Sequence, residues 1–343
     1  MRKFIQTIQN IWKIEDLRQR LLTTLLFVLI YRFGSFVVLP GIDPTALTAL
    51  QAQTAGGLMA LLDMFSGGAF SNASVFALGI MPYISASIVI QLLTIAVPYF
   101  QKMQKEGESG RQKMNQITRY LTVAILLFQG PSYLVNLSVQ MAQAGQAVAV
   151  GFNWFTISST ILLCAGSMFV MWLGERITDR GIGNGISFII LIGIIARFPA
   201  ALVQEFSSRL NEGGGLMLFI LEIIILLFVF AFAILLVQGT RRIPVQYAKR
   251  MVGNKQYGGV RQYIPLKVNS ANVMPIIFAQ AIMFIPIALA GFSTSESASA
   301  FTRAFMNNDG FWYNAVFALL IIVFTYFYTA IIINPVQMAE NLK

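Results

Sequence analysis

Side chains that could perform chemistry are scarce in this chain of 343 residues. It contains no histidine, so the commonest general base and the usual zinc ligand are both missing. Its single cysteine, Cys164, lies inside an apolar run, which excludes a disulfide framework or a cysteine metal cluster. Glu222 is the sole acid well inside a predicted membrane span, and it has no acidic neighbour there. We therefore expect no enzymatic activity, no cofactor and no metal.

Two short motifs imitate known catalytic or binding loops. Residues 107–110 read GESG, which is similar to the GxSG of intramembrane serine proteases, but no histidine is available to activate the serine. Residues 181–185 read GIGNG, which is similar to a glycine-rich nucleotide loop but lacks the preceding strand and the Lys-Ser/Thr ending. We interpret the second motif as a tight turn between two helices.

Long apolar runs dominate the rest of the chain, which is 57% hydrophobic and only 11% charged. A soluble domain of this length could not bury that much apolar surface. A helical span needs about 20 mostly apolar residues. Eight windows qualify, at about 21–39, 74–97, 118–139, 155–174, 183–203, 216–238, 273–292 and 312–333. The sequence predicts an all-α polytopic membrane protein, and no strand alternation is evident.

The basic residues are sorted between alternate loops. Of the 24 Lys and Arg, about 20 fall in five segments, at 1–20, 98–119, 174–181, 239–272 and 334–343. This is the positive-inside pattern, so these segments and both ends of this chain are expected in the cytoplasm. The first of them reads as an amphipathic cytoplasmic helix that leads into a span. The net charge of +10 is explained by topology and anionic lipid rather than by nucleic acid.

Two features stand on the external side. Residues 57–70 form a short apolar segment that cannot cross a membrane and is too hydrophobic for water, so a re-entrant or interfacial piece is predicted. The Gly67-Gly68 pair within it could act as a flexible joint. Arg32 interrupts the first span off-centre, and we expect its side chain to extend to the outer interface.

Two predicted spans, 74–97 and 273–292, are poor membrane anchors. Each contains proline and polar residues, which lipid tolerates where they face neighbouring helices or a water-filled cavity. The residues concerned are Gly79, Pro82, Gln91, Pro275, Gln280 and Pro286. Two such helices in one chain indicate a conduit or a moving interface.

The loop 239–272 carries seven basic residues and no acidic one. Anionic lipid is one candidate ligand for this loop. An acidic partner, either a protein or ribosomal RNA, is the other.

Five stretches of the chain closely resemble the SecY family, the central subunits of the bacterial protein-conducting channel. They read FALGIMPYISASIVIQLL (76–93), KEGESGR (105–111), ERITDRGIGNGIS (175–187), RRIPVQYAKR (241–250) and NPVQMAENLK (334–343). The resemblance implies an hourglass pore with a plug, a ring of apolar side chains and a lateral gate that opens to lipid. The family has ten spans in two inverted halves of five. We expect spans 1–5 within 21–203 and spans 6–8 within 204–343, so two further helices would lie beyond Lys343.

Functional residues follow from the matching motifs. The pore ring would comprise Ile80, Ile84, Ile186, Ile190 and Ile277. The plug would correspond to about 57–70, with Leu58, Leu61, Leu62, Phe65, Gly67 and Gly68. The lateral gate would include Ser87, Gln91, Asn272 and Gln280. Partner docking would involve Arg241, Arg242, Lys249 and Arg250.

The resemblance implies a passive channel that secretes unfolded polypeptides and inserts membrane proteins laterally into the bacterial inner membrane. The SecE and SecG subunits would accompany it, and the SecA ATPase or a ribosome would engage it from the cytoplasm, together with signal peptides. A secondary transporter is the alternative, because broken helices also suit alternating access. A transporter should carry a polar or ionisable cluster at the midplane, whereas this chain offers aliphatic residues there. An intramembrane protease is a more distant alternative.

Overall fold

The computed structural model describes residues 12–42, 63–143, 154–211, 215–246, 250–252, 255–257, 261–271, 275–276, 278–279, 282–283 and 310–333. The chain divides into two compact units. The first comprises residues 1–201 and 285–310, and the second comprises residues 202–284 and 311–343.

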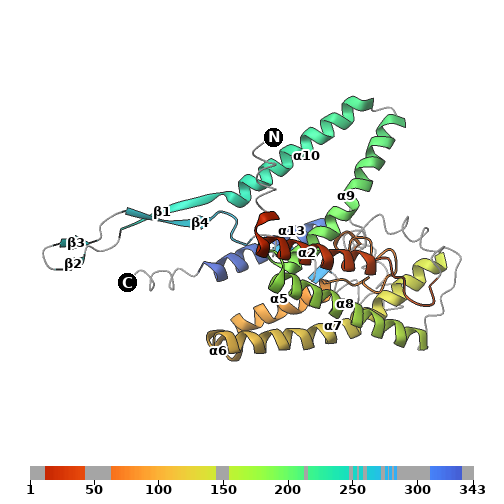
Figure 1. Cartoon of the computed structure of the whole chain (residues 1–343), viewed down its shortest axis with the longest axis horizontal. Coiled ribbons are helices and arrows are strands. Elements are labelled where there is room, and N and C mark those ends of the chain that lie inside the picture. The colour runs from red at the N-terminus through yellow and green to blue at the C-terminus, as the bar shows by residue number, and fades with distance from the viewer. Residues whose placement is uncertain are drawn as a thin grey trace. The chain divides into compact units, whose positions relative to one another are not determined.

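The first unit is a bundle of helices (Figure 1). Its described helices are α2 (Glu15–Gly34), α5 (Met81–Ala96), α6 (Pro98–Lys105), α7 (Glu108–Gln143), α8 (Trp154–Arg180) and most of α9 (Gly185–Asn211). Helix α7 packs against both α5 and α8, and α2 packs against α8. Helix α2 runs without a break from the charged start at Glu15 into the first predicted span.

The predicted turn between α8 and α9 is present and tightly bonded. The Asn184 side chain accepts the first free amides of α9, from Ile186 at 3.1 Å and Ser187 at 3.2 Å. This satisfies two of the backbone donors that a helix start leaves unpaired. The turn is also attached to α2, because the Ile182 amide donates to the Thr24 hydroxyl at 3.2 Å.

The second unit contains α10 (Gly215–Gln238), α13 (Phe311–Ile332) and four short strands. The strands are β1 (Thr240–Gln246), β2 (Arg250–Val252), β3 (Lys255–Tyr257) and β4 (Arg261–Lys267). β1 pairs antiparallel with β4, and β2 with β3. The β1–β4 ribbon leads away from the end of α10, with β2 and β3 at its far end (Figure 1).

The sequence reading missed these strands. Their apolar alternation is hidden by basic residues and by two prolines, Pro244 and Pro265, which sit opposite Tyr263 and Arg242 in the ladder. Proline is tolerated where a strand has a free edge, and a two-stranded ribbon has only edges. The cross-strand pair Ile243 and Ile264 is the main apolar contact that the register allows.

Four described helices are long and apolar enough to cross a membrane: α8, α9, α10 and α13. The pair α5 and α6 adds a fifth if they count as one span bent by 102°. Eight spans are therefore not confirmed among the described residues. Helix α2 begins with a cluster of charges, and most of the seventh predicted span lies outside the described part of the chain.

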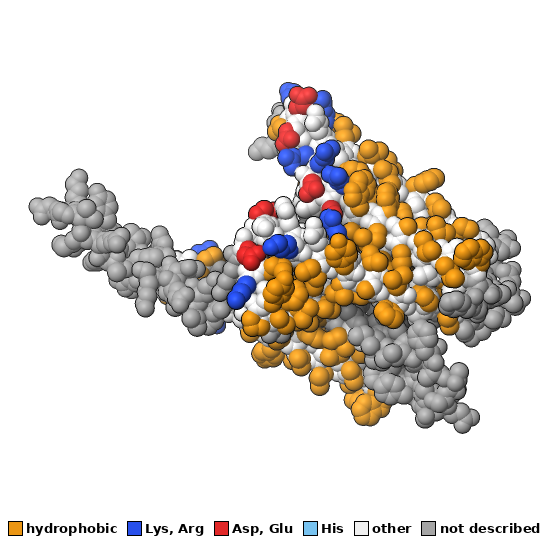
Figure 2. All heavy atoms as spheres, turned by 90° about the horizontal axis from the view of Figure 1, so that it is seen from below, with side chains coloured by type: hydrophobic (Ala, Val, Ile, Leu, Met, Phe, Trp, Pro, Cys, Tyr) orange, Lys and Arg blue, Asp and Glu red, His pale blue; other side chains and the backbone are white. Residues whose placement is uncertain are grey.

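Apolar side chains cover much of the face shown in Figure 2, and acidic and basic side chains gather in clusters beside them. Helix α10 is the extreme case, because none of its residues is buried along its described length. Such a surface is unstable in water and stable in lipid or against a membrane partner. The protein is therefore a multi-pass membrane protein.

Candidate functional site

The described stretch before α5, residues 63–80, consists mostly of turns. After one helical turn at residues 63–65, turns run to Ile80, and α5 begins only at Met81, several residues after the predicted start of the second span. Gly67, Gly68 and Gly79 adopt φ of +65°, +92° and +53°, which glycine alone adopts without strain. We call residues 63–80 the turn segment.

Three side chains from the surrounding helices donate hydrogen bonds to carbonyl oxygens of the turn segment. They are the Tyr31 hydroxyl to Ser66 at 3.1 Å, the Arg32 guanidinium to Gly67 at 2.8 Å, and the Tyr133 hydroxyl to Phe70 at 2.9 Å. Non-helical backbone inside a membrane protein persists only where such partners satisfy it. The expected extension of Arg32 to the outer interface stays a prediction, and the structure shows in addition that its guanidinium donates to the Gly67 carbonyl.

Three glycines provide the space into which the turn segment fits. A Cβ atom added at Gly34 of α2 would overlap the Phe76 ring, and one at Gly166 of α8 would overlap the Val75 carbonyl oxygen. One added at Gly193 of α9 would come within 2.5 Å of the Phe65 carbonyl oxygen. Small residues in membrane helices permit this close approach of backbone to backbone.

An apolar core completes the surroundings of the turn segment. We call these surroundings, which α2, α7, α8 and α9 form, the seat. Phe70 and Ala73 of the turn segment pack in a cluster with Leu134 and Leu137 of α7 and Leu163 of α8. The Phe70 ring also meets the Tyr133 ring edge-on, with centroids 4.8 Å apart. The turn segment is thus buried by helices that are far apart in the sequence.

One buried ion pair belongs to the same seat. The side chain of Asp63 is 1% exposed, and its Oδ2 atom faces the guanidinium of Arg197 on α9. Its other oxygen, Oδ1, accepts the Ser71 amide at 2.8 Å. The acid and the cation therefore join the start of the turn segment to α9.

Four of the five predicted pore-ring residues lie on, or directly before, two helices of the first unit. Ile80 precedes α5 and Ile84 lies in its first turn, and both are buried. Ile186 and Ile190 in the first turns of α9 are half-buried, and Ile186 approaches Gly174 of α8. Ile277 lies outside the described residues. Convergence of these five side chains on one constriction stays a prediction.

The remaining predicted residues are only partly described. Phe65, Gly67 and Gly68 of the predicted plug lie in the turn segment, whereas Leu58, Leu61 and Leu62 lie outside the described residues. Of the predicted gate, Ser87 and Gln91 lie one turn apart on α5, with Gln91 Nε2 3.5 Å from Ser87 Oγ. Asn272 and Gln280 lie outside the described residues.

The predicted docking residues belong to the β ribbon. Arg241 and Arg242 are exposed on β1, and successive strand residues point to opposite faces. Arg250 belongs to β2, where it is paired with Tyr257, and Lys249 is not described.

Glu222 is not the isolated acid that the sequence indicated. Its Oε1 atom lies 2.6 Å from Nη2 of Arg209, whose Nε atom contacts Glu205 at 2.9 Å. The carboxylate is therefore neutralised by a partner from the neighbouring helix.

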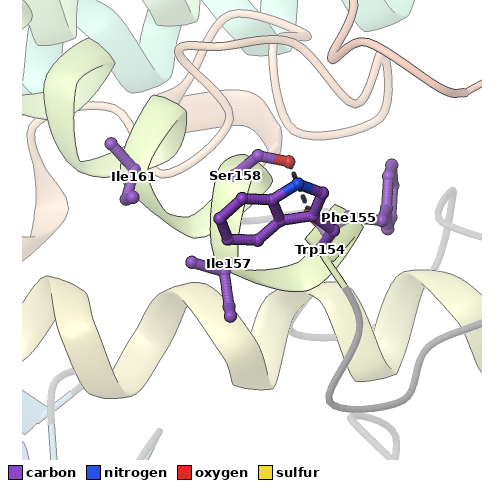
Figure 3. Close-up of a pocket in the computed structure, with 5 residues that line it drawn as sticks. All are labelled: Trp154, Phe155, Ile157, Ser158 and Ile161. Atoms are coloured by element: carbon purple, nitrogen blue, oxygen red, sulfur yellow. Dashed lines mark hydrogen bonds between the residues drawn. The ribbon is translucent and has the colours of Figure 1, made fainter.

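A shallow pocket on α8 offers no chemistry. Its lining, drawn in Figure 3, is Trp154, Phe155, Ile157, Ser158 and Ile161. The Ser158 hydroxyl already donates to the Phe155 carbonyl at 3.1 Å, and Trp154 is 84% exposed. An exposed tryptophan at a helix end is typical of a membrane interface.

Sequence reasoning missed the groups that hold the turn segment. Glycine within an apolar span, as at Gly166 and Gly193, was a usable signal of close packing. So was Arg197, a cation within a predicted span, which should have prompted a search for an acid. Nothing in the sequence distinguishes Tyr31 and Tyr133 from other membrane tyrosines.

Comparisons with known proteins agree with this architecture. A family model described as SecY matches residues 74–343. The chain is 42% identical to the protein translocase subunit SecY of Streptomyces scabiei over 97% of this chain and 78% of the relative. It is 43% identical to the same subunit of Aquifex aeolicus over 98% and 78%.

Two solved structures share the fold. One is Sec61 in the canine ribosome–channel complex, with a TM-score of 0.55, 16% identity, and coverage of 95% of this chain and 76% of that chain. The other is a SecY whose plug domain is described as stabilising the closed state of the translocation channel, with a TM-score of 0.51, 18% identity, and coverage of 80% and 58%. The family model and the relatives above establish that the chain belongs to the SecY family of protein-translocation channel subunits.

Proposed function

We propose that the chain is a passive channel for unfolded polypeptides, closed at rest by the turn segment. The observation that carries this is the burial of residues 63–80, of which 66–80 are non-helical, among α2, α7, α8 and α9. A buried segment can leave its seat as a unit when hydrogen bonds and side-chain packing hold it there and it is not itself part of a membrane-spanning helix. A relative's plug domain is described in the same role.

The pore ring is proposed at Ile80, Ile84, Ile186, Ile190 and Ile277. Bulky aliphatic side chains at a narrow neck exclude water and ions, since apolar surface facing water costs about 25 cal/mol per Å². They offer no hydrogen bonds that would retain a passing polypeptide. A lateral gate is proposed between the helix that carries Ser87 and Gln91 and the stretch with Asn272 and Gln280.

The proposed setting is the bacterial inner membrane, with both ends of this chain in the cytoplasm. SecE and SecG are the proposed companion subunits. SecA or a ribosome is proposed to dock on the basic ribbon, which is supported by the exposure of Arg241 and Arg242 and by the ribosome complex of the Sec61 neighbour. Signal peptides and unfolded chains are the proposed cargo.

The alternative of a coupled transporter lacks support in the described residues. Glu222, the acid that could have served proton coupling, is bound by Arg209 at 2.6 Å. This ion pair gives Glu222 a structural contact between α9 and α10.

The test is translocation by cells depleted of their own SecY and supplied with this protein. Secretion should be restored, and a variant with Ile80, Ile84, Ile186 and Ile190 replaced by Ser should leak ions in reconstituted vesicles. The matched control replaces Val89 and Ile195, which are 40% and 52% exposed on the same two helices. Failure to restore secretion, or equal leak from both variants, would contradict the proposal.

A further inference from the structure

Asp63 is a buried acid at the point where the turn segment begins. Its side chain is 1% exposed, and Oδ1 is satisfied by the Ser71 amide at 2.8 Å. Among the residues that the structure describes, no hydrogen-bond donor is aligned with Oδ2, and the group that faces this atom is the guanidinium of Arg197. Neutralisation of the carboxylate therefore depends on one cation.

Arg197 reaches this acid from α9 and contacts more than the acid. Its Nη2 atom also donates to the Ser71 hydroxyl at 2.9 Å, and the guanidinium lies beside Gly68, 3.3 Å from where a Cβ would stand. One side chain of α9 thus contacts the start, the glycine turn and the far end of the loop 63–71. Unlike Asp63, it is 46% exposed, so the protein encloses it far less.

The two partners differ in what they lose if the other is removed. A carboxylate buried without a cation is strongly disfavoured, because desolvation of the charge is no longer compensated. A half-exposed guanidinium is not enclosed in this way, so it loses less when the acid is removed. The ion pair therefore stabilises only the seated conformation, in which Asp63 is dry.

We propose that Asp63 and Arg197 form an ionic latch that keeps the turn segment in its seat until a polypeptide engages the channel. This inference rests on the proposed function, in which the turn segment closes the channel. When the turn segment leaves its seat, Asp63 and Arg197 separate, and water becomes the hydrogen-bond partner of both. Water that enters the seat weakens the attraction, so the latch releases as the channel wets.

The test compares ion leak and seating in the channel purified with its companion subunits and reconstituted in vesicles. Arg197→Met should raise leak by about tenfold or more, since a charged hydrogen-bonded contact is lost and a buried acid is left unpaired. Asp63→Asn keeps the shape and should raise leak less. The double variant should leak less than Arg197→Met alone, because it removes the uncompensated charge.

Arg209→Met is the matched control. It removes an arginine of the same helix whose ion-pair partners are Glu205 and Glu222 rather than a residue of the turn segment. Leak should stay unchanged.

Seating is read independently with a thiol probe. In a Cys164→Ser background, Ala69→Cys places a thiol at a fully buried position of the turn segment. A membrane-impermeant maleimide should react with it slowly in the unmodified latch and about tenfold faster with Arg197→Met. Ser167→Cys, buried on α8, reports the fold and should stay protected in every variant.

The outcomes separate this inference from the proposed function. If Arg197→Met neither leaks nor exposes residue 69 while secretion is normal, the latch is overturned and the channel assignment stands. If the double variant leaks as much as the sum of the single ones, the two residues do not act as a pair. If residue 167 also becomes reactive in Arg197→Met, that variant is misfolded and Asp63→Asn is used in its place. The latch then requires that Asp63→Asn exposes residue 69 while residue 167 stays protected.

Discussion

The turn segment and the β ribbon are two described places where this apolar helical chain leaves the helix, and their backbones are satisfied in different ways. In the turn segment, local turn hydrogen bonds are supplemented by side chains of neighbouring helices, because Tyr31, Arg32 and Tyr133 each donate to a backbone carbonyl. In the ribbon, the backbone satisfies itself through the ladder from Thr240 to Gln246 and from Arg261 to Lys267. One region is enclosed by helices, and the other presents exposed basic side chains.

The difference shows how each region depends on the rest of the molecule. The seat of the turn segment is assembled from several helices, so a substitution in any of them should alter it. The ribbon has its own hydrogen bonds, so its surface charges can change without loss of structure. Substitutions should therefore affect folding and seating in the first region and binding in the second.

The largest effect is expected from Gly166→Val. Its side chain would overlap the Val75 carbonyl, which cannot move without displacing the turn segment. Overpacking of this kind costs about 1–3 kcal/mol or more. Thermal unfolding in detergent should show a clear fall in Tm. Ala165→Val adds a similar side chain to an exposed position on the same helix and should leave Tm unchanged. Equal Tm values for the two variants would mean that α8 does not contact the segment as described.

A smaller effect is expected from Tyr133→Phe. The ring and its contact with Phe70 remain, but the Phe70 carbonyl loses the hydroxyl that lies 2.9 Å away. That carbonyl keeps the Ala73 amide at 3.2 Å, so the change removes one of its two hydrogen bonds, which costs about 0.5–1.5 kcal/mol. Labelling of a cysteine at residue 69 should become faster. Tyr120→Phe, at a side chain that is 76% exposed, is the control, and a rate no faster than that control would argue against the hydrogen bond.

The smallest effect on stability, and the largest on binding, is expected in the ribbon. Replacement of Arg241, Arg242, Lys249 and Arg250 by Glu should change the free energy of unfolding by no more than about 0.5 kcal/mol, because surface changes rarely cost more. Tm should therefore stay almost unchanged. Affinity for SecA or ribosomes should fall strongly, and more at low salt than at high salt. Reversal of Arg18 and Arg20 on α2 serves as a charge-change control. If the affinity is the same after the charge reversal and at every salt concentration, the ribbon is not part of the docking surface.

The sequence was sufficient to predict the helical membrane architecture, because apolar windows and sorted charges depend on composition that can be read directly. Helices α8, α9 and α10 lie close to their predicted windows. The turn segment was predicted only as a re-entrant piece, since the partners of its carbonyls come from helices far away in the sequence. Arg32 shows the limit, because its hydrogen bond to the Gly67 carbonyl depends on tertiary structure that the local sequence pattern does not contain. The strands of the ribbon were missed because prolines and charges obscure a short alternation.

The central claim, that the turn segment closes the idle channel and leaves its seat during conduction, is tested most directly by thiol labelling with a polypeptide arrested inside. The probe is Ala69→Cys in a Cys164→Ser background, at a position with no exposed surface in the seated state. The account predicts slow labelling of the idle channel and labelling faster by about tenfold or more once the arrested chain is in place. Equal labelling rates with and without the arrested chain would contradict it.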